Sequence, residues 1–148
     1  YDKLLSSARA KKKGKEIRAA YIDAIEGLDI LLAAIKSASE RGFVHSIDKR
    51  KILLDSPHKA LNYLLQSGAG CVAKQWMLIN NQHVKELKLC CSQLAFVHDE
   101  LQFESDPAHA KDLCSSLVLS ATEAGEYYNM RVRIDAEATT GKDWSETH

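Results

Sequence analysis

The chain has 148 residues, of which 45% are hydrophobic and 27% are charged. This length suits one domain, and the composition excludes both a disordered chain and a membrane-embedded one, since no apolar run approaches the ~20 residues that span a bilayer. Basic and acidic side chains balance at 20 each, which argues against a protein whose whole surface binds nucleic acid. The first residues lack the apolar centre of a signal peptide, so the expected location is the cytoplasm.

A basic segment occupies residues 1–18. It holds seven Lys or Arg and two Asp or Glu side chains, a local charge of +5 that the rest of the chain must balance. A cluster of this size is able to bind phosphate groups. A solvated helix start or a frayed terminus produces the same composition just as commonly. The candidate phosphate-binding residues are Lys11, Lys12, Lys13 and Lys15.

Residues 16–41 are predicted to form one long amphipathic helix, because their apolar side chains recur at helical spacing and Gly42 provides a stop. Residues 43–54 are predicted to form a β-hairpin. Its natural turn is the two-residue Asp48-Lys49, although lysine is not preferred at the second position.

Ser56 and Pro57 predict the start of another helix, since serine caps free amides and proline suits the first helical position. The predicted core face of this helix consists of Leu61, Leu64, Leu65, Gly68, Val72, Trp76 and Ile79. Beside that face, His58, Asn62 and Gln66 recur every four residues and form a polar stripe. Their side chains either reach toward a partner or are simply the solvent side of the helix.

Two short apolar runs meet at the tripeptide His98-Asp99-Glu100. Residues 94–97 are continuously apolar, whereas residues 101–104 alternate as a half-buried strand does. We therefore expect a β-hairpin with the acidic residues at its bend. Packed strands there hold a carboxylate still enough to order a divalent cation and its phosphate ligands. An ordinary solvated turn has the same pattern, since aspartate is a common turn residue, and spacing alone favours that alternative.

A further helix is predicted after Asp106-Pro107, with a buried face at positions 110, 113, 117, 120 and 124 and an end near Gly125. Residues 131–138 then alternate apolar with charged side chains and predict a last strand. The total is about three helices and five strands joined by hairpins. The expected fold class is therefore α+β with an antiparallel sheet.

Four cysteines, at positions 71, 90, 91 and 114, contain no C-x-x-C pair. We expect all four to be reduced and to lie in or near the core. A zinc site would have to recruit histidines from scattered positions without any ligand spacing, so zinc is disfavoured.

Four motifs in order make the chain resemble family A DNA polymerases, the group that includes DNA polymerase I, and within it the replicative polymerases of short-tailed phages. Ile47-Asp-Lys-Arg50 resembles the Leu-Asp-Gly-Arg hairpin, with Lys49 in place of the usual glycine. The stretch from Ser56 to Gln66 resembles the phage helix start Ser-Pro-His-x-Ala-Leu-Asn-x-Leu-Leu-Gln. Val97-His-Asp-Glu100 resembles motif C, and residues 141–148 resemble the tryptophan-containing end with a terminal His148. The match covers nearly the whole chain.

The resemblance implies a catalytic role for the acidic tripeptide. Asp99 resembles the motif C aspartate that binds the catalytic Mg²⁺ ions. In a two-metal mechanism, such ions assist the attacking 3′ oxygen and stabilise the leaving pyrophosphate. Glu100 would support that site, and His98 resembles the histidine that approaches the primer terminus.

The polar stripe gains an implied role in DNA binding. Asn62 and Gln66 resemble the pair that contacts the nascent duplex in its minor groove. There, purine N3 and pyrimidine O2 offer acceptors in every correct base pair, so amide donors test pairing without reading sequence. His58 lies where other family members carry a basic residue, and its DNA-binding role is implied less directly.

The resemblance also implies a domain organisation. Residues 1–18 are expected to be a basic segment following missing fingers, and residues 19–148 the C-terminal part of the polymerase palm. Neither the second metal-binding aspartate, in motif A, nor the nucleotide-binding fingers helix nor an exonuclease domain is present. We therefore expect the chain to be inactive alone, with the missing N-terminal portion, primer-template DNA and dNTP as its partners. Apolar surface left uncovered also predicts self-association of the fragment.

Two other functional classes remain open. A non-catalytic DNA-binding accessory module would use the basic segment and the polar stripe, and its salt-sensitive duplex binding would not depend on Asp99. A metal-dependent phosphohydrolase built from His98, Asp99 and another histidine would work without a partner. For a phage-encoded protein, the expected compartment is the bacterial host cytoplasm.

Overall fold

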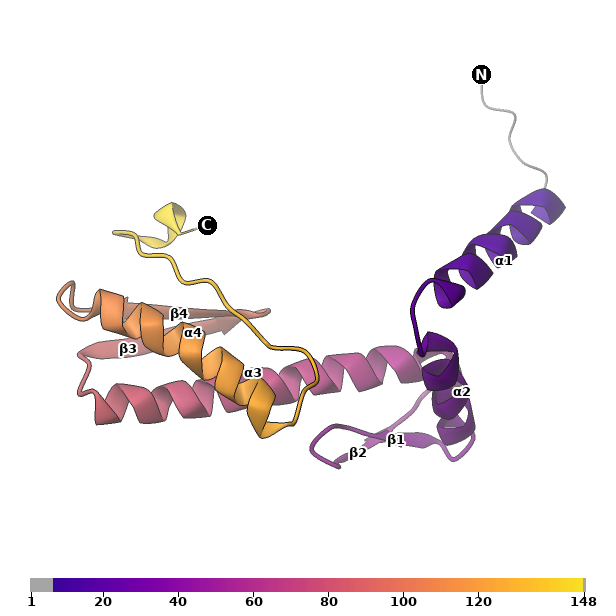
Figure 1. Ribbon diagram of the computed structural model, residues 1–148, viewed down its shortest axis with the longest axis horizontal. Helices are drawn as coiled ribbons and strands as arrows, with labels where there is room; N and C mark the ends of the chain where they lie inside the picture. Colours follow the sequence, from indigo (N-terminus) through magenta and orange to yellow (C-terminus); the bar gives the residue numbers. More distant parts are fainter. Residues whose placement is uncertain (1–6, 148) are drawn as a thin grey trace, which may run out of the picture. The chain divides into compact units, whose positions relative to one another are not determined.

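The computed structural model describes residues 7–147. That range contains four α-helices and two separate two-stranded antiparallel sheets (Figure 1). The elements are α1 (Ser7–Asp23), α2 (Leu28–Ser39), β1 (Phe43–His45), β2 (Lys51–Leu53), the 3₁₀ turn η1 (Pro57–Lys59), α3 (Ala60–Glu86), β3 (Cys91–Val97), β4 (Glu100–Ser105), α4 (Ala110–Tyr127) and the 3₁₀ turn η2 (Trp144–Glu146). The expected α+β class is confirmed.

The chain divides into two compact units. Unit 1 comprises the chain up to His45 together with Lys51–Leu64, and unit 2 comprises Ser46–Arg50 together with the chain from Leu65 onward. Within residues 7–147, no helix has the length and apolar content needed to span a bilayer.

The single helix predicted over residues 16–41 is wrong. α1 ends at Asp23 and α2 begins at Leu28. Between them Gly27 has a φ of 79°, a left-handed conformation that glycine adopts easily and that interrupts a continuous helix. α1 also begins at Ser7, so the described part of the basic segment is helical. The stop is confirmed, because α2 ends just before Gly42, whose φ is 77°.

Unit 1 has a small apolar core. Ile35 of α2, Val44 of β1 and Ala60 of α3 are buried and packed together. The partly buried side chains packed against them are Ala38, Ile52, Leu54, Leu61 and Leu64. Because side chains alternate along a strand, pairing Val44 with Ile52 turns these two residues inward and leaves the other face of the β1–β2 hairpin outside.

The loop between β1 and β2 differs from the predicted two-residue turn. The Ser46 amide donates to the Arg50 carbonyl at 2.9 Å, so the loop consists of Ile47, Asp48 and Lys49. A three-residue hairpin loop needs a left-handed residue at its last position, and Lys49 takes that conformation with a φ of 67°. The predicted two-residue turn is therefore wrong, and Lys49 lies at the left-handed position of a three-residue loop.

The start of α3 also differs from the prediction. The Ser56 side chain caps no amide, and Pro57 opens the 3₁₀ turn η1 rather than the α-helix itself. Asp55 stabilises this start instead, since its carboxylate accepts hydrogen bonds from Lys59 Nζ at 2.6 Å and from the Tyr63 hydroxyl at 3.0 Å. The hydrogen bond from Lys59 holds the pKa of Asp55 below its usual value.

In unit 2, α3 and α4 are joined by buried polar contacts. The Ser116 hydroxyl donates to Asn80 Oδ1 at 2.8 Å, and both side chains are buried. Trp76 Nε1 donates to the Leu117 carbonyl at 2.8 Å. The predicted α4 face is confirmed at Leu113, Ser120 and Ala124, which are all buried.

The strand predicted over residues 131–138 is wrong, because this segment pairs with no strand among the described residues. It is held against α4 instead. The Ile134 carbonyl accepts a hydrogen bond from Thr122 Oγ1 at 3.1 Å, and the Ile134 side chain lies directly over Gly125. Alternating exposure follows from an extended chain with one side against a helix. His148 lies outside the described residues.

All four cysteines are free thiols, as expected. Cys71 is buried and Cys91 and Cys114 are partly buried. Cys90 is exposed, so its expected place in or near the core is wrong. It directly precedes β3, where its amide donates to His109 Nδ1 at 2.8 Å.

Replacing Lys49 with glycine is expected to stabilise the protein. A left-handed conformation costs a non-glycine residue about 1–2 kcal/mol, and the glycine variant removes this cost. Part of the gain is lost because glycine is more flexible in the unfolded chain. We expect the free energy of unfolding to rise by about 0.5–1 kcal/mol in urea denaturation. Lys51→Gly, in strand β2, is the matched control and is expected to lower it. A Lys49→Gly variant less stable than wild type would contradict this account of the loop.

Two helical glycines are expected to respond oppositely to alanine. At Gly125 an added Cβ would lie 2.7 Å from Ile134 Cγ1, so Gly125→Ala displaces the tail and costs about 1–3 kcal/mol. At Gly70 nothing lies within 4 Å of the added atom, so Gly70→Ala raises helix propensity and stabilises by about 0.5–1 kcal/mol. Thermal unfolding of both variants measures the difference. Equal effects would show that Ile134 does not occupy the space above Gly125.

Candidate functional site

The candidate site is the turn between β3 and β4. The strands pair up to Val97 and Glu100, so His98 and Asp99 alone form the turn, as expected for a hairpin with acidic residues at its bend. His98 has a φ of 57° at the first turn position, where such turns often carry glycine. A left-handed non-glycine residue costs about 1–2 kcal/mol, so the paired strands hold this turn in a strained conformation.

The three side chains of the tripeptide differ in exposure. His98 and Asp99 are exposed, whereas Glu100 is partly buried as the first residue of β4. Glu100 Oε1 accepts a hydrogen bond from Gln102 Nε2 at 3.0 Å, which orients one carboxylate oxygen. Asp99 is therefore the carboxylate most accessible to a ligand arriving from outside.

The donor set suits a hard cation but is incomplete. Mg²⁺ prefers oxygen ligands in an octahedral arrangement, and the carboxylates of Asp99 and Glu100 are ligands of that kind. Within residues 7–147, no three His, Cys, Asp or Glu side chains gather so that they could hold a metal ion. The remaining ligands would have to come from elsewhere.

The predicted polar stripe is exposed along the start of α3. Asn62 and Gln66 lie one helical turn apart and His58 lies in η1, all three with exposed side chains. Gln66 belongs to unit 2 together with the β3–β4 turn, whereas His58 and Asn62 belong to unit 1. The predicted set is thus not contained in one compact unit.

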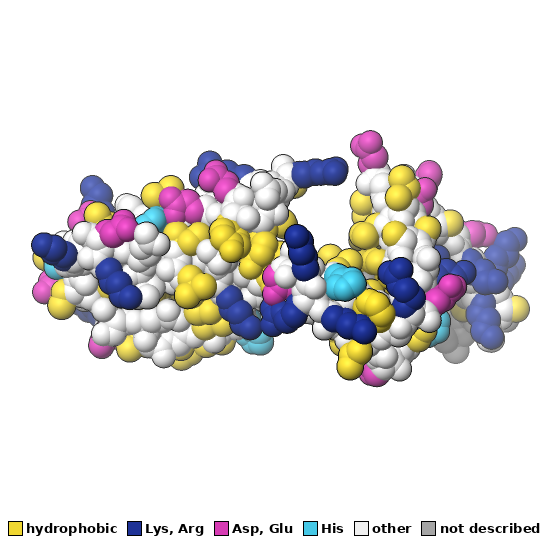
Figure 2. All heavy atoms as spheres, turned by 90° about the horizontal axis from the view of Figure 1, so that it is seen from below, with side chains coloured by type: hydrophobic (Ala, Val, Ile, Leu, Met, Phe, Trp, Pro, Cys, Tyr) yellow, Lys and Arg dark blue, Asp and Glu magenta, His cyan; other side chains and the backbone are white. Residues whose placement is uncertain are grey.

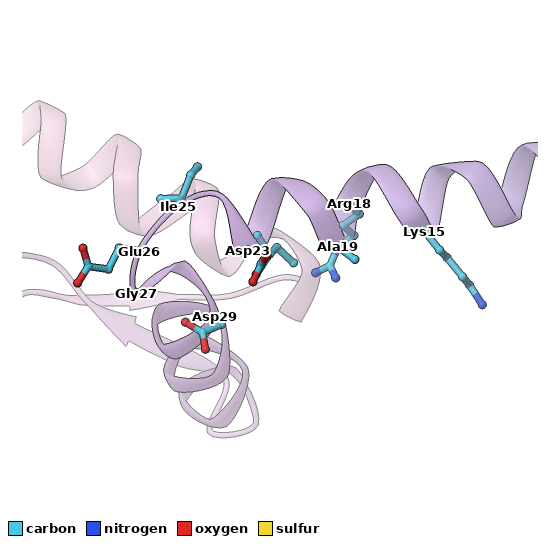
Figure 3. A pocket seen from close by; sticks show the side chains of 9 residues that line it. Lys15, Arg18, Ala19, Asp23, Ile25, Glu26, Gly27 and Asp29 are labelled. Atoms are coloured by element: carbon cyan, nitrogen blue, oxygen red, sulfur yellow. The ribbon is translucent and has the colours of Figure 1, made fainter.

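The predicted phosphate-binding lysines lie on α1, where Lys11, Lys12, Lys13 and Lys15 are all exposed. Lys15 also lines an open groove of about 600 Å³ between the end of α1 and the start of α2. The other charged residues of this groove include Arg18 but also Asp23, Glu26 and Asp29, and Lys15 extends away from the acidic residues (Figure 3). The mixed charges make the groove a poor anion site, whereas the lysines themselves face solvent.

A second polar cluster was not predicted from the sequence. Arg50 Nη2 lies 2.6 Å from Asp48 Oδ2 and donates to Cys71 Sγ at 3.5 Å, while the Cys71 thiol shares a hydrogen bond of 3.4 Å with the Ser46 hydroxyl. The Arg50 guanidinium holds the pKa of Asp48 below its usual value. The cluster fixes the loop at residues 46–50 against α3. The Asp48-x-Arg50 spacing could have indicated the ion pair. The hydrogen bond from Arg50 to Cys71 could not have been predicted, because it depends on how the chain folds.

Comparison with known proteins gives a consistent result. Residues 5–146 match the family model described as DNA polymerase family A. The chain is 29% identical to the DNA-directed DNA polymerase of Escherichia phage Phieco32, 26% to that of Enterobacteria phage T3 and 25% to that of Escherichia phage T7. These alignments cover 92–93% of this chain but 23% of each relative, so the chain spans about a quarter of their length.

A solved structure shows the same fold. It is the POL domain of Pol1 from M. smegmatis in complex with DNA primer-template and dNTP. The TM-score is 0.75 at 23% sequence identity, over 84% of this chain and 24% of that one.

The incomplete donor set predicts weak metal binding by this chain alone. We expect Mn²⁺, a paramagnetic substitute for Mg²⁺, to broaden the NMR signals of residues 97–100 only at about 1 mM or above. Asp99→Asn should remove the broadening, whereas Glu104→Gln, further along β4, should leave it. Binding at about 10 μM or below would instead indicate a complete site.

Proposed function

The chain belongs to DNA polymerase family A, and from this premise we propose that it is the C-terminal palm portion of a DNA-directed DNA polymerase. The observation that carries the proposal is the β3–β4 turn. It presents an exposed Asp99 from a backbone fixed by strand pairing on both sides. In the complete enzyme the reaction is template-directed nucleotidyl transfer.

Asp99 would hold a divalent cation jointly with a carboxylate from outside this chain, which fits the partial donor set described above. When bound, two such ions activate the 3′ hydroxyl and stabilise the departing pyrophosphate. Glu100, one carboxylate oxygen of which accepts a hydrogen bond from Gln102, would support that site. His98 approaches the primer terminus from the same turn.

The polar stripe and the lysines of α1 would hold the DNA. The amide groups of Asn62 and Gln66 donate to the acceptors that every correct base pair presents in the minor groove. His58 adds a polar contact to the neighbouring DNA backbone. The lysines at positions 11, 12, 13 and 15 neutralise phosphates, which makes binding weaken as salt rises.

We propose the same domain organisation as the resemblance implies. Residues 1–18 follow the fingers, and residues 19–148 form the C-terminal palm. Activity then requires the portion of a polymerase that carries motif A and the fingers, and residues 1–148 by themselves are inactive. Large apolar side chains such as Ile30, 72% exposed, and Val132, 74% exposed, support self-association of the isolated chain. For a phage-encoded enzyme, the compartment is the host cytoplasm.

A DNA-binding accessory module is the second candidate, because α1 is a basic helix with no buried residue. Such a module would bind duplex DNA in a salt-sensitive manner without needing Asp99. A metal-dependent phosphohydrolase built from His98 and Asp99 has less support, because it needs a third ligand and residues 7–147 gather none.

Templated primer extension with Mg²⁺ tests the proposal. The chain is mixed with an upstream polymerase fragment that carries motif A and the fingers, and association is verified by size-exclusion chromatography. We expect extension only when both pieces are present. Asp99→Ala should lower it by about a hundredfold or more, since each metal contributes several kcal/mol of transition-state stabilisation.

Glu104→Ala is the control, because it removes a carboxylate from β4 at a position away from the turn, and it should retain activity. Extension by this chain alone would contradict the proposed dependence on a partner. An associated pair that is inactive, or one that is insensitive to Asp99→Ala, would favour the accessory module.

A further inference from the structure

The outward face of the β1–β2 hairpin carries an aromatic and basic surface. The strand register pairs Phe43 with Leu53 and His45 with Lys51. Directly opposite residues of antiparallel strands point to the same side, so these four side chains share one face while Val44 and Ile52 face the core. We call them, together with Arg41, the hairpin face.

Two cations lie near the Phe43 ring. The Lys51 ammonium lies 3.9 Å from the centre of its ring, and the Arg41 guanidinium lies 5.7 Å from the same centre. His45 packs against the ring edge to face at 5.3 Å. Attraction of each cation to the ring offsets part of their mutual repulsion. The ring thereby holds the Lys51 ammonium closely and the Arg41 guanidinium more loosely, and a phosphate-bearing ligand would neutralise both charges.

The hairpin face also exposes apolar surface between its charges. Leu53 is 74% exposed, and Phe43 is partly buried. Basic, hydrophobic and histidine side chains lie next to one another over this hairpin (Figure 2). Cations that contact the backbone, interleaved with apolar and aromatic groups on which bases stack, are the pattern of surfaces that bind single-stranded nucleic acid.

We propose that the hairpin face binds a single-stranded stretch of DNA. Arg41 and Lys51 contact its phosphates, and a base stacks on Phe43 in place of the more distant Arg41 guanidinium, with Leu53 beside it. A duplex presents mainly phosphates and sugars to its surroundings, so it would leave the apolar part of this face without a partner. The choice of DNA rests on the proposed function, whereas the surface itself needs no metal and no residue of the β3–β4 turn.

Fluorescence anisotropy of the full chain with a labelled oligothymidylate of about 15 nucleotides tests this inference. EDTA removes divalent ions, and excess unlabelled duplex occupies the lysines of α1. We expect the double variant Arg41→Ala/Lys51→Ala to lose about tenfold in affinity and the slope of log K against log salt to fall by about 0.7 for each lost contact. Phe43→Leu and Leu53→Thr should weaken binding of the oligonucleotide but not of duplex.

Lys85→Ala is the matched control, because it removes an exposed cation from the last turn of α3 and should change affinity less than twofold. Circular dichroism verifies that each variant is folded. If Phe43→Leu is unstable, the double variant Arg41→Ala/Lys51→Ala decides the test, because both of its positions are exposed and their replacement should not disturb the core. The inference would be overturned if the double variant bound the oligonucleotide with wild-type affinity. It would also be overturned if Phe43→Leu and Leu53→Thr weakened the binding of duplex and of oligonucleotide equally. Asp99→Ala should bind normally, so a failure of primer extension and a failure of strand binding remain distinguishable.

Discussion

The buried hydrogen bond between Asn80 and Ser116 is the constraint on which unit 2 depends. Asn80 is 1% exposed, and a buried amide without a partner costs about 1–3 kcal/mol, so α4 must keep Ser116 opposite it. This fixes the rotation of α4 against α3. The β3–β4 hairpin connects the end of one helix to the start of the other. His109 Nδ1, just before α4, accepts the Cys90 amide and ties the base of the hairpin in place. Asp99 lies at the opposite, free end.

Much of the fold could be predicted where a pattern depends on local chemistry. The β3–β4 hairpin was predicted because a continuous apolar run before the tripeptide gives way to alternating apolar and polar residues after it. The buried face of α4 was predicted because small and apolar residues recur there at helical spacing. The predictions failed where tertiary context decides. Gly27 lies within the stretch of apolar residues at helical spacing, and it interrupts the helix only through its left-handed backbone conformation. Leu65 belongs to the apolar face of α3 yet is 58% exposed, so periodicity overstated the core.

The candidate site could be predicted in part for the same reason. Placing Asp99 at a turn required only the pattern of the flanking strands. The positive φ of His98 was not predicted, because a non-glycine residue adopts it uncommonly and here does so between strands that are paired on both sides. The grouping of Phe43 with Arg41 and Lys51 was also missed. Phe43 and Lys51, eight positions apart, become neighbours only when the hairpin register is known, and Arg41 lies near the same ring.

The irregularity in β3 has a consequence for how this protein would aggregate. The pairing shifts between Gln93 and Ala95, so Leu94 is an extra residue that bends and twists the strand. A twisted edge with a bulge is a poor template for adding further strands in register. Strand addition at the β3 edge is therefore disfavoured, and this edge is protected from the growth of fibrils.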